Sequence, residues 1–114
     1  MNIDELKSNI MPLAEKYGLR LVILFGSQAT ERTHKKSDID IAVSGESTLD
    51  MTRLTMDFYN FFNREDVELV DISSASPTLM YAVVRDGKLL YEKEAGAFMK
   101  WKLYAMWVWR DTAW

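Results

Sequence analysis

The stretch LFGSQATERTHKKSDIDIAV, residues 24–43, decides how this chain folds and what site it can build. It begins at the end of an almost unbroken apolar run, residues 19–25, which is too short for a helix of its own and is typical of a buried strand. Residues 38–43 alternate between polar and apolar side chains, which predicts a second, half-buried strand. The ten residues between Ser27 and Asp38 suffice for a short helix and a return. We therefore expect the second strand to begin beside the end of the first.

Asp38 and Asp40 are expected to lie side by side on one face of the second strand. Residues i and i+2 of a strand share a face and are about 7 Å apart at the backbone. The other face carries Ile39, Ile41 and Val43, which are apolar and suited to packing. Two like charges this close repel each other, and a cation between them removes the penalty. Sites made of carboxylate oxygens suit Mg²⁺ or Mn²⁺, and a pair of such ions can activate an attacking hydroxyl and stabilise a leaving pyrophosphate.

Gly26 and Ser27 supply the other half of the pattern. A glycine after a buried strand lets the backbone turn sharply and approach a ligand closely. If a helix opens at Ser27, its free N–H groups and positive dipole end favour a bound triphosphate. A lone Asp-x-Asp is common on exposed strands and a lone Gly-Ser is usually only a turn. Their combination at this spacing is more specific and predicts a nucleotide site.

The rest of the chain alternates predicted helices and strands, which indicates one α+β domain. A first helix is expected from Ile3 to Tyr17, capped by Asn2 and ended by Gly18, with Pro12 bending it or splitting it in two. Ser47 or Thr48 is expected to cap the next helix, and Ser76 with Pro77 to begin the one after it. The expected strands are residues 19–25, 38–43, 67–72 and 88–91, and the expected helices are residues 3–17, 47–63 and 78–85, with a helical tail from residue 93.

The amino-acid composition narrows the kinds of binding partner and the cellular compartment that we expect for this protein. The 114 residues carry a formal net charge of −3 and no cysteine. The charge argues against extended nucleic-acid binding, because phosphate contacts need Lys and Arg. The lack of cysteine excludes disulfides and thiolate metal sites. The acidic start of the chain does not resemble a secretory signal, and no apolar run has membrane-spanning length, so a cytoplasmic protein is expected.

Residues 24–29 and 37–43 resemble the signature of the DNA polymerase β-like nucleotidyltransferase superfamily, and within it the minimal nucleotidyltransferase (MNT) group. The resemblance covers about residues 3–92 and is sharpest over residues 24–43. It implies the polymerase β-like palm fold, a short mixed sheet with helices packed against it. It also implies that Gly26 and Ser27 hold the triphosphate of ATP, while Asp38 and Asp40 bind two Mg²⁺ ions.

A third carboxylate is implied on a neighbouring strand, in a pattern like Val-Asp-Leu-Val-Asp. This chain reads VELVD over residues 67–71, so Glu68 stands at the matching position. Glutamate can coordinate Mg²⁺, but its extra methylene changes its reach. Asp71 is the alternative, and it lies on the opposite face of the predicted strand from Glu68. We favour Glu68 as the third catalytic and metal-binding residue.

The loop between the two strands departs from the family pattern. Relatives often carry Arg-Gly where this chain has Thr30-Glu31, so the expected phosphate-facing arginine is missing. Arg32, Lys35 or Lys36 can take over the neutralisation of the pyrophosphate, although each is also an ordinary loop charge. The only histidine, His34, is interpreted as a surface residue.

The tail is apolar on every side of its predicted helix. Such a helix must be covered on more than one face, by its own domain and by another chain. We therefore divide the chain into a nucleotidyltransferase domain, residues 1–92, and a C-terminal helix, residues 93–114, that packs on it and forms a partner interface. The apolar residues of this tail are Phe98, Met99, Trp101, Leu103, Tyr104, Ala105, Met106, Trp107, Val108 and Trp109.

The resemblance also implies a partner and an acceptor. MNT proteins commonly pair with a HEPN-domain ribonuclease toxin, and the MNT antitoxin silences it by transferring AMP from ATP to a tyrosine hydroxyl. Two alternatives stay open: an inactive antitoxin that acts by binding alone, and nucleotidyl transfer to a small molecule such as an aminoglycoside. A homodimer is possible beside the heteromeric complex.

Overall fold

The computed structural model describes residues 2–26, 38–46 and 48–112. Helices and strands alternate along most of the chain, and strand pairing gathers the four strands into one sheet. The elements are α1 (Ile3–Lys16), β1 (Leu21–Phe25), β2 (Ile39–Ser44), α2 (Met51–Phe62), β3 (Val67–Asp71), the short 3₁₀ helix η1 (Ile72–Ser74), α3 (Pro77–Asp86), β4 (Lys88–Glu92) and α4 (Ala97–Thr112).

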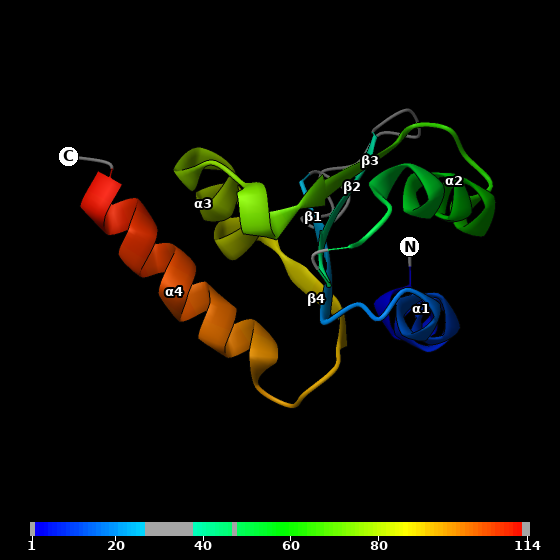
Figure 1. Cartoon of the computed structure of the whole chain (residues 1–114), viewed down its shortest axis with the longest axis horizontal. Coiled ribbons are helices and arrows are strands. Elements are labelled where there is room, and N and C mark those ends of the chain that lie inside the picture. Colours follow the sequence, from blue (N-terminus) through cyan, green and yellow to red (C-terminus); the bar gives the residue numbers. More distant parts are fainter. Residues whose placement is uncertain (1, 27–37, 47, 113–114) are drawn as a thin grey trace.

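The sheet is mixed and has the strand order β3-β2-β1-β4. β1 runs antiparallel to both β2 and β4, whereas β2 and β3 are parallel and are joined through α2. Helices cover both faces, with α1 and α2 on one side and α3 and α4 on the other (Figure 1). This arrangement confirms the predicted α+β class with a short mixed sheet.

Two apolar layers fill the space between the sheet and its helices. On the α1 and α2 side, Ile10, Leu54 and Phe58 are fully buried against alternate residues of β1 and β2. On the other side, Val83 of α3 and Phe98 of α4 pack against the opposite residues of the same strands. Because β1 is buried at all five positions, it reads as a continuous apolar run rather than an alternating one.

Most helix beginnings follow their predicted caps, and one does not. Asn2 Oδ1 accepts a hydrogen bond from Glu5 N at 3.1 Å, and Ser76 Oγ accepts one from Leu79 N at 3.2 Å. The prediction of Ser47 or Thr48 as the cap of α2 is wrong. Asp50 caps that helix instead, since its Oδ1 accepts from Arg53 N at 3.1 Å.

Pro12 does not divide the first helix, because α1 continues through it from Ile3 to Lys16. The chain then turns at Gly18, which has a positive φ of 64°. The first strand begins at Leu21, two residues later than expected. The strand expected to end at Ile72 ends at Asp71, where η1 begins.

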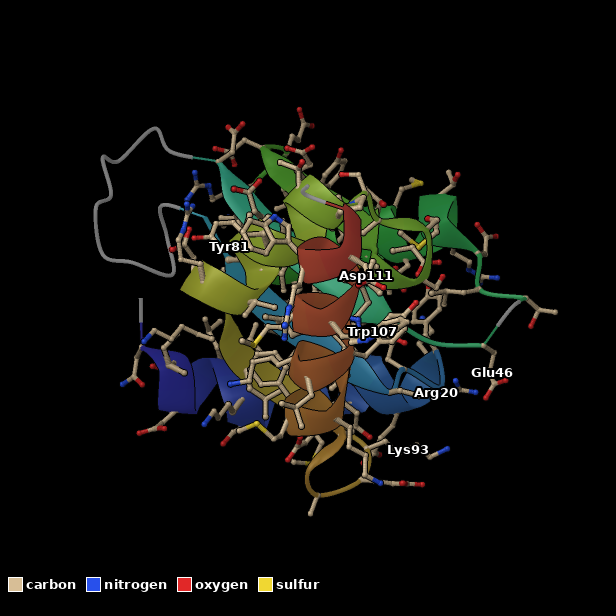
Figure 2. All side chains as sticks on the ribbon, turned by 90° about the vertical axis from the view of Figure 1, so that its left-hand side faces the viewer. Arg20, Glu46, Tyr81, Lys93, Trp107 and Asp111 are labelled. Carbon is tan, nitrogen blue, oxygen red and sulfur yellow. The ribbon has the colours of Figure 1, made fainter. Side chains whose placement is uncertain are left out.

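The C-terminal helix lies along α3 on the outside of the molecule (Figures 1 and 2). Its start is fixed by Glu92, whose carboxylate accepts hydrogen bonds from Gly96 N at 3.2 Å and Phe98 N at 3.0 Å. The expected helical tail is therefore present, but it begins at Ala97 rather than at residue 93. Among the described helices, α4 included, none has the length and apolar character needed to cross a membrane.

Candidate active site

Strand pairing brings the chemically important residues to one end of the sheet. Asp40 is the second residue of β2, and in the sheet register it faces Phe25, the last residue of β1, on one side. On the other side it faces Glu68 of β3. Because paired residues of neighbouring strands point to the same face, the Asp40 and Glu68 side chains are adjacent. Their carboxyl groups share a hydrogen bond.

This environment raises the pKa of Asp40 from 3.8 to about 6. Burial is the largest cause, since it disfavours the charged carboxylate. The charge of Glu68 and its hydrogen bond come next, and the charge of Asp38 adds a smaller effect. Asp38 lies just before β2 and its side chain is exposed. Two further carboxylates, those of Glu68 and Asp38, therefore lie close enough to Asp40 to raise its pKa.

Gly26 makes room for the Asp40 carboxylate. Its φ of 75° lies in the left-handed region that favours glycine. A Cβ atom at this position would overlap Asp40 Oδ2 and would lie 3.2 Å from Asp40 Cγ. The backbone at the end of β1 thus touches the first carboxylate of the site, as the spacing between the two strands predicted.

Asp71 has a different role from Glu68. Its Oδ1 accepts hydrogen bonds from Ser73 N at 2.9 Å and Ser73 Oγ at 2.7 Å, and in this way it caps η1. In the register it faces Val43, three positions beyond the pair of Asp40 and Glu68, so it belongs to the other face of the sheet. Of the two candidates for the third carboxylate, the structure brings only Glu68 to Asp40.

An arginine that the sequence analysis missed lies beside the same end of the sheet. Arg64 Nε donates to Asp66 Oδ1 at 2.7 Å, and the backbone oxygen of Asp66 accepts from Ile39 N at 3.0 Å. The hydrogen bond to Asp66 is the main cause that raises the pKa of Arg64, and the charge of Asp38 contributes. The signal available in the sequence was an Arg-x-Asp pattern directly before a strand.

Comparison with known proteins identifies the family. Residues 8–95 match the model of the family described as "Polymerase beta, Nucleotidyltransferase". The chain belongs to the polymerase beta nucleotidyltransferase family. This match confirms the resemblance inferred from residues 24–43 and the type of fold.

Three relatives within this nucleotidyltransferase family illustrate the similarity. The protein adenylyltransferase MntA of Shewanella oneidensis is 42% identical over 76 residues, which are 64% of this chain and 54% of that protein. A chain in the crystal structure of a toxin–antitoxin with AMP-PNP is 31% identical with a TM-score of 0.79, covering 92% of this chain and 87% of the other. A chain in the complex of tri-AMPylated S. oneidensis HEPN toxin with MNT antitoxin is 28% identical with a TM-score of 0.74, covering 96% and 88%.

The carboxylate oxygens of Asp40 and Glu68 suit the divalent cation that nucleotidyltransferases use, although they do not surround such an ion by themselves. Within residues 2–26, 38–46 and 48–112, no three His, Cys, Asp or Glu side chains converge closely enough to hold a metal ion by themselves. Asp40 and Glu68 form an adjoining oxygen pair whose mutual repulsion a cation would relieve. Mg²⁺ commonly takes only one or two carboxylates and completes its shell with water and phosphate oxygens. The residues present therefore fit the ion.

Several predicted site residues lie outside the described part of the chain. These are Ser27, Arg32, Lys35 and Lys36, together with His34 and the two departures Thr30 and Glu31.

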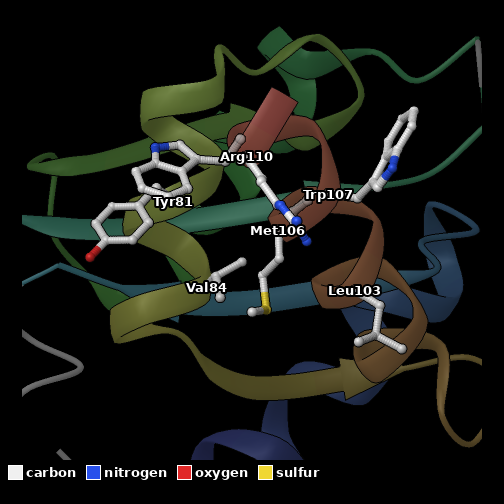
Figure 3. Close-up of a pocket in the computed structure, with 8 residues that line it drawn as sticks. Tyr81, Val84, Leu103, Met106, Trp107 and Arg110 are labelled. Carbon is white, nitrogen blue, oxygen red and sulfur yellow. The ribbon is translucent and has the colours of Figure 1, made fainter. Parts of the chain in front are cut away.

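A separate apolar groove of about 430 Å³ lies between α3 and α4, and none of the site carboxylates lines it (Figure 3).

Proposed function

We propose that this protein is an antitoxin that transfers AMP from ATP to a tyrosine hydroxyl of a HEPN toxin. The observation that carries the proposal is the contact of Gly26, Asp40 and Glu68 at one end of the sheet. The names of the relatives support the rest. One is a protein adenylyltransferase, one complex contains AMP-PNP, and another pairs an MNT antitoxin with an AMPylated HEPN toxin.

The residues divide into three groups in this proposal. Asp38, Asp40 and Glu68 would hold Mg²⁺ together with phosphate oxygens of ATP, since the three carboxylates do not converge on an ion by themselves. The bound ion would supply positive charge to the triphosphate and to the attacking oxygen. Gly26 and Ser27 would receive the triphosphate at the end of β1, where a Cβ atom on residue 26 would overlap the Asp40 carboxylate. The residues proposed to neutralise the pyrophosphate are Arg32, Lys35 and Lys36.

The transfer is a single displacement at the α-phosphorus of ATP. The tyrosine oxygen forms a bond to this phosphorus, the bond to the oxygen that bridges to the β-phosphate breaks, and pyrophosphate leaves. The phenol loses its proton to a carboxylate at this end of the sheet, and the ionised form of Asp40 is the candidate acceptor. The chain thereby supplies both the carboxylates that would hold the cation and the proton acceptor.

We also propose that residues 1–92 carry catalysis and that residues 93–114 serve packing and assembly. The family match, which ends at residue 95, supports a boundary in this region. The second part holds α4, whose inner face joins the core while its outer face is apolar and exposed.

The decisive experiment is intact-mass spectrometry of a HEPN toxin encoded beside this chain, after incubation with the full chain, ATP and Mg²⁺. We expect the toxin to gain mass in whole AMP units on a tyrosine. The double variant Asp38→Asn with Asp40→Asn should give no gain. The matched control, Glu15→Gln with Glu94→Gln, removes the same number of exposed charges beside the start of β1, at the other end of the sheet, and should keep full transfer.

Two outcomes would contradict the proposal. Unchanged transfer by the Asp38 and Asp40 variant would remove these residues from catalysis. A stable complex with the toxin but no mass gain would favour the alternative of an antitoxin that acts by binding alone.

A further inference from the structure

Four exposed residues form a stripe along the outer side of α4. Lys100, Tyr104, Trp107 and Asp111 follow one another at spacings of four, three and four residues, which keeps them on one side of a helix. Tyr104 is 54% exposed and Trp107 62% exposed. Figure 2 shows Trp107 and Asp111 on the outside of the molecule, and Figure 3 shows Trp107 pointing away from Tyr81 of α3. We call these four residues the outer stripe.

The opposite side of α4 is already occupied by its own domain. Phe98 and Ala105 are buried, and Phe98 and Trp101 pack into the layer that α3 and the sheet form. Trp109 stacks on Tyr81 of α3, with ring centroids 4.8 Å apart. The intrachain core therefore uses the inner side and leaves the outer stripe uncovered.

The outer stripe is complementary to itself when two copies run antiparallel. Its order is cation, aromatic, aromatic, anion, and the first spacing equals the last. A second α4 running in the opposite direction therefore places its Asp111 opposite Lys100 and its Trp107 opposite Tyr104. The same two contacts then repeat on the other side of the pair. This is the isologous arrangement that a two-fold axis produces. If one residue of the first copy contacts a second residue of the other copy, then that second residue in the first copy contacts the first residue in the other.

We propose that α4 pairs antiparallel with α4 of a second copy of this chain, with the two-fold axis between Tyr104 and Trp107. The spacing of four, three and four residues is that of the contact line between two packed helices. Each opposed pair of residues forms one layer, so the two aromatic layers lie at the centre and the two ionic layers at the ends. Aromatic pairs supply most of the contact, and the ionic layers fix the antiparallel direction. The inference is independent of the proposed adenylyltransferase activity.

The exposed area suits a weak dimer better than a permanent one. Tyr104, Trp107 and the flanking Met99, Leu103 and Met106 are each 54–62% exposed. Together they offer roughly 600 Å² per copy, which is somewhat less than the ~800 Å² per partner of a standard interface. We therefore expect an equilibrium between monomer and dimer in the micromolar range.

The first measurement is sedimentation velocity of the full chain from about 5 to about 500 µM, a range that brackets the affinity expected of such an interface. The mass should rise from 13.2 kDa towards twice that value. Trp107→Ala should keep the monomer mass over the whole range, because it removes both central contacts.

Charge reversal tests the pairing itself. Lys100→Asp and Asp111→Lys each place like charges opposite one another in both end layers, so each should weaken the dimer about tenfold or more. The double variant restores opposite charges and should restore the dimer. All of these variants should fold, because an acid near the start of α4 and a base near its end both suit the helix dipole. Lys7→Asp on α1 is the matched control and should dimerise like the unchanged chain.

Three results would overturn the proposal. The chain could keep its monomer mass at every concentration, or the double reversal could fail to rescue the dimer. Trp107→Ala could abolish a complex with a HEPN toxin while the unchanged chain alone stays monomeric, which would assign the outer stripe to that partner instead.

Discussion

At the scale of single residues, the carboxyl group of Asp40 is held in a place that disfavours its charge. Its pKa of about 6 lies above its usual 3.8 because it is partly buried beside Glu68 and near Asp38. At neutral pH the folded protein therefore carries an unfavourable negative charge at this position. The same feature makes the site receptive to a cation, because a bound cation favours the ionised form. The burial and the neighbouring carboxylates that destabilise the ionised Asp40 in the folded protein therefore also favour the binding of a cation beside it.

Because the ionised carboxylate of Asp40 destabilises the folded protein at neutral pH, we predict that Asp40→Asn stabilises the protein in the absence of divalent metal. A carboxyl group with a raised pKa favours folding at pH values below its unfolded pKa of 3.8, and this contribution is lost as the pH rises through about 6. At pH 7 the variant should be more stable by about 1 kcal/mol, less than the full shift would give because solvent partly screens this partly buried group. The gain should disappear near pH 4. Urea unfolding at the two pH values measures it, and an equal gain at both would contradict the assigned cause.

The two candidate third carboxylates should respond differently to substitution. Glu68→Gln removes the charge beside Asp40 and should lower AMP transfer about 100-fold or more with little loss of stability. Asp71→Ala removes the cap of η1 and should lower the free energy of unfolding by about 1 kcal/mol while transfer per folded molecule is kept. Activity and urea unfolding measured on both variants decide the matter. The opposite pattern would make Asp71 the catalytic residue.

At the scale of elements, the start of α2 shows how a local signal can be ambiguous. Ser47, Thr48 and Asp50 are all residue types that cap helices. The backbone turn in which Leu49 N donates to Glu46 O at 3.1 Å precedes the helix and leaves Asp50 at the capping position. Sequence alone could not choose, because the choice depends on where the chain leaves β2.

This assignment predicts unequal effects at two neighbouring positions. Asp50→Ala should lower the free energy of unfolding by about 1 kcal/mol, because Arg53 N loses its acceptor. Thr48→Ala serves as the matched control and should change it by less than about 0.5 kcal/mol. Thermal or urea unfolding followed by circular dichroism compares the two. A larger loss for Thr48→Ala would restore the cap predicted from the sequence.

The first helix shows tertiary packing overriding a local preference. Proline inside a helix removes one hydrogen bond and costs about 3 kcal/mol. α1 nevertheless continues through Pro12, and the residues on either side of it, Ile10 and Ala14, are fully buried against the sheet. The packing of this apolar stripe offsets the missing hydrogen bond, so the helix is not split.

At the scale of the whole molecule, α4 is part of the fold as well as an exposed surface. Phe98 is 9% exposed and belongs to the core layer on the α3 side, whereas its neighbour Met99 is 55% exposed. Removing the entire tail would therefore uncover the core. Single substitutions on its outer side are the sound way to test what it binds.

The two sides of α4 should differ sharply in their effect on stability. Phe98→Ala should lower the free energy of unfolding by about 3 kcal/mol, because it leaves a cavity between α4 and the sheet. Met99→Ala should lower it by less than about 0.5 kcal/mol, because the side chain is largely in solvent. Urea unfolding of the two variants provides the measurement. Equal losses would mean that α4 does not pack through Phe98.

The sequence by itself determined the class of the fold and predicted the main members of the candidate site. The apolar run before Gly26, the spacing to Asp38 and the alternation over residues 38–43 are local patterns, and each depends only on the periodicity of a strand or on the freedom of glycine. These patterns sufficed for the α+β class and for the placement of Asp40 beside Gly26, since the chain between them is short.

Only the tertiary structure decided between Glu68 and Asp71 as the carboxylate beside Asp40, and decided which face of α4 is free. Glu68 lies beside Asp40 because β2 and β3 pair in one particular register, and a one-residue shift would have turned Glu68 to the other face. Likewise, the tail is apolar on every side in sequence, and contact with α3 and the sheet separates its buried side from its exposed one. Register and packing arise from contacts between elements far apart in the chain, so no local pattern could determine them.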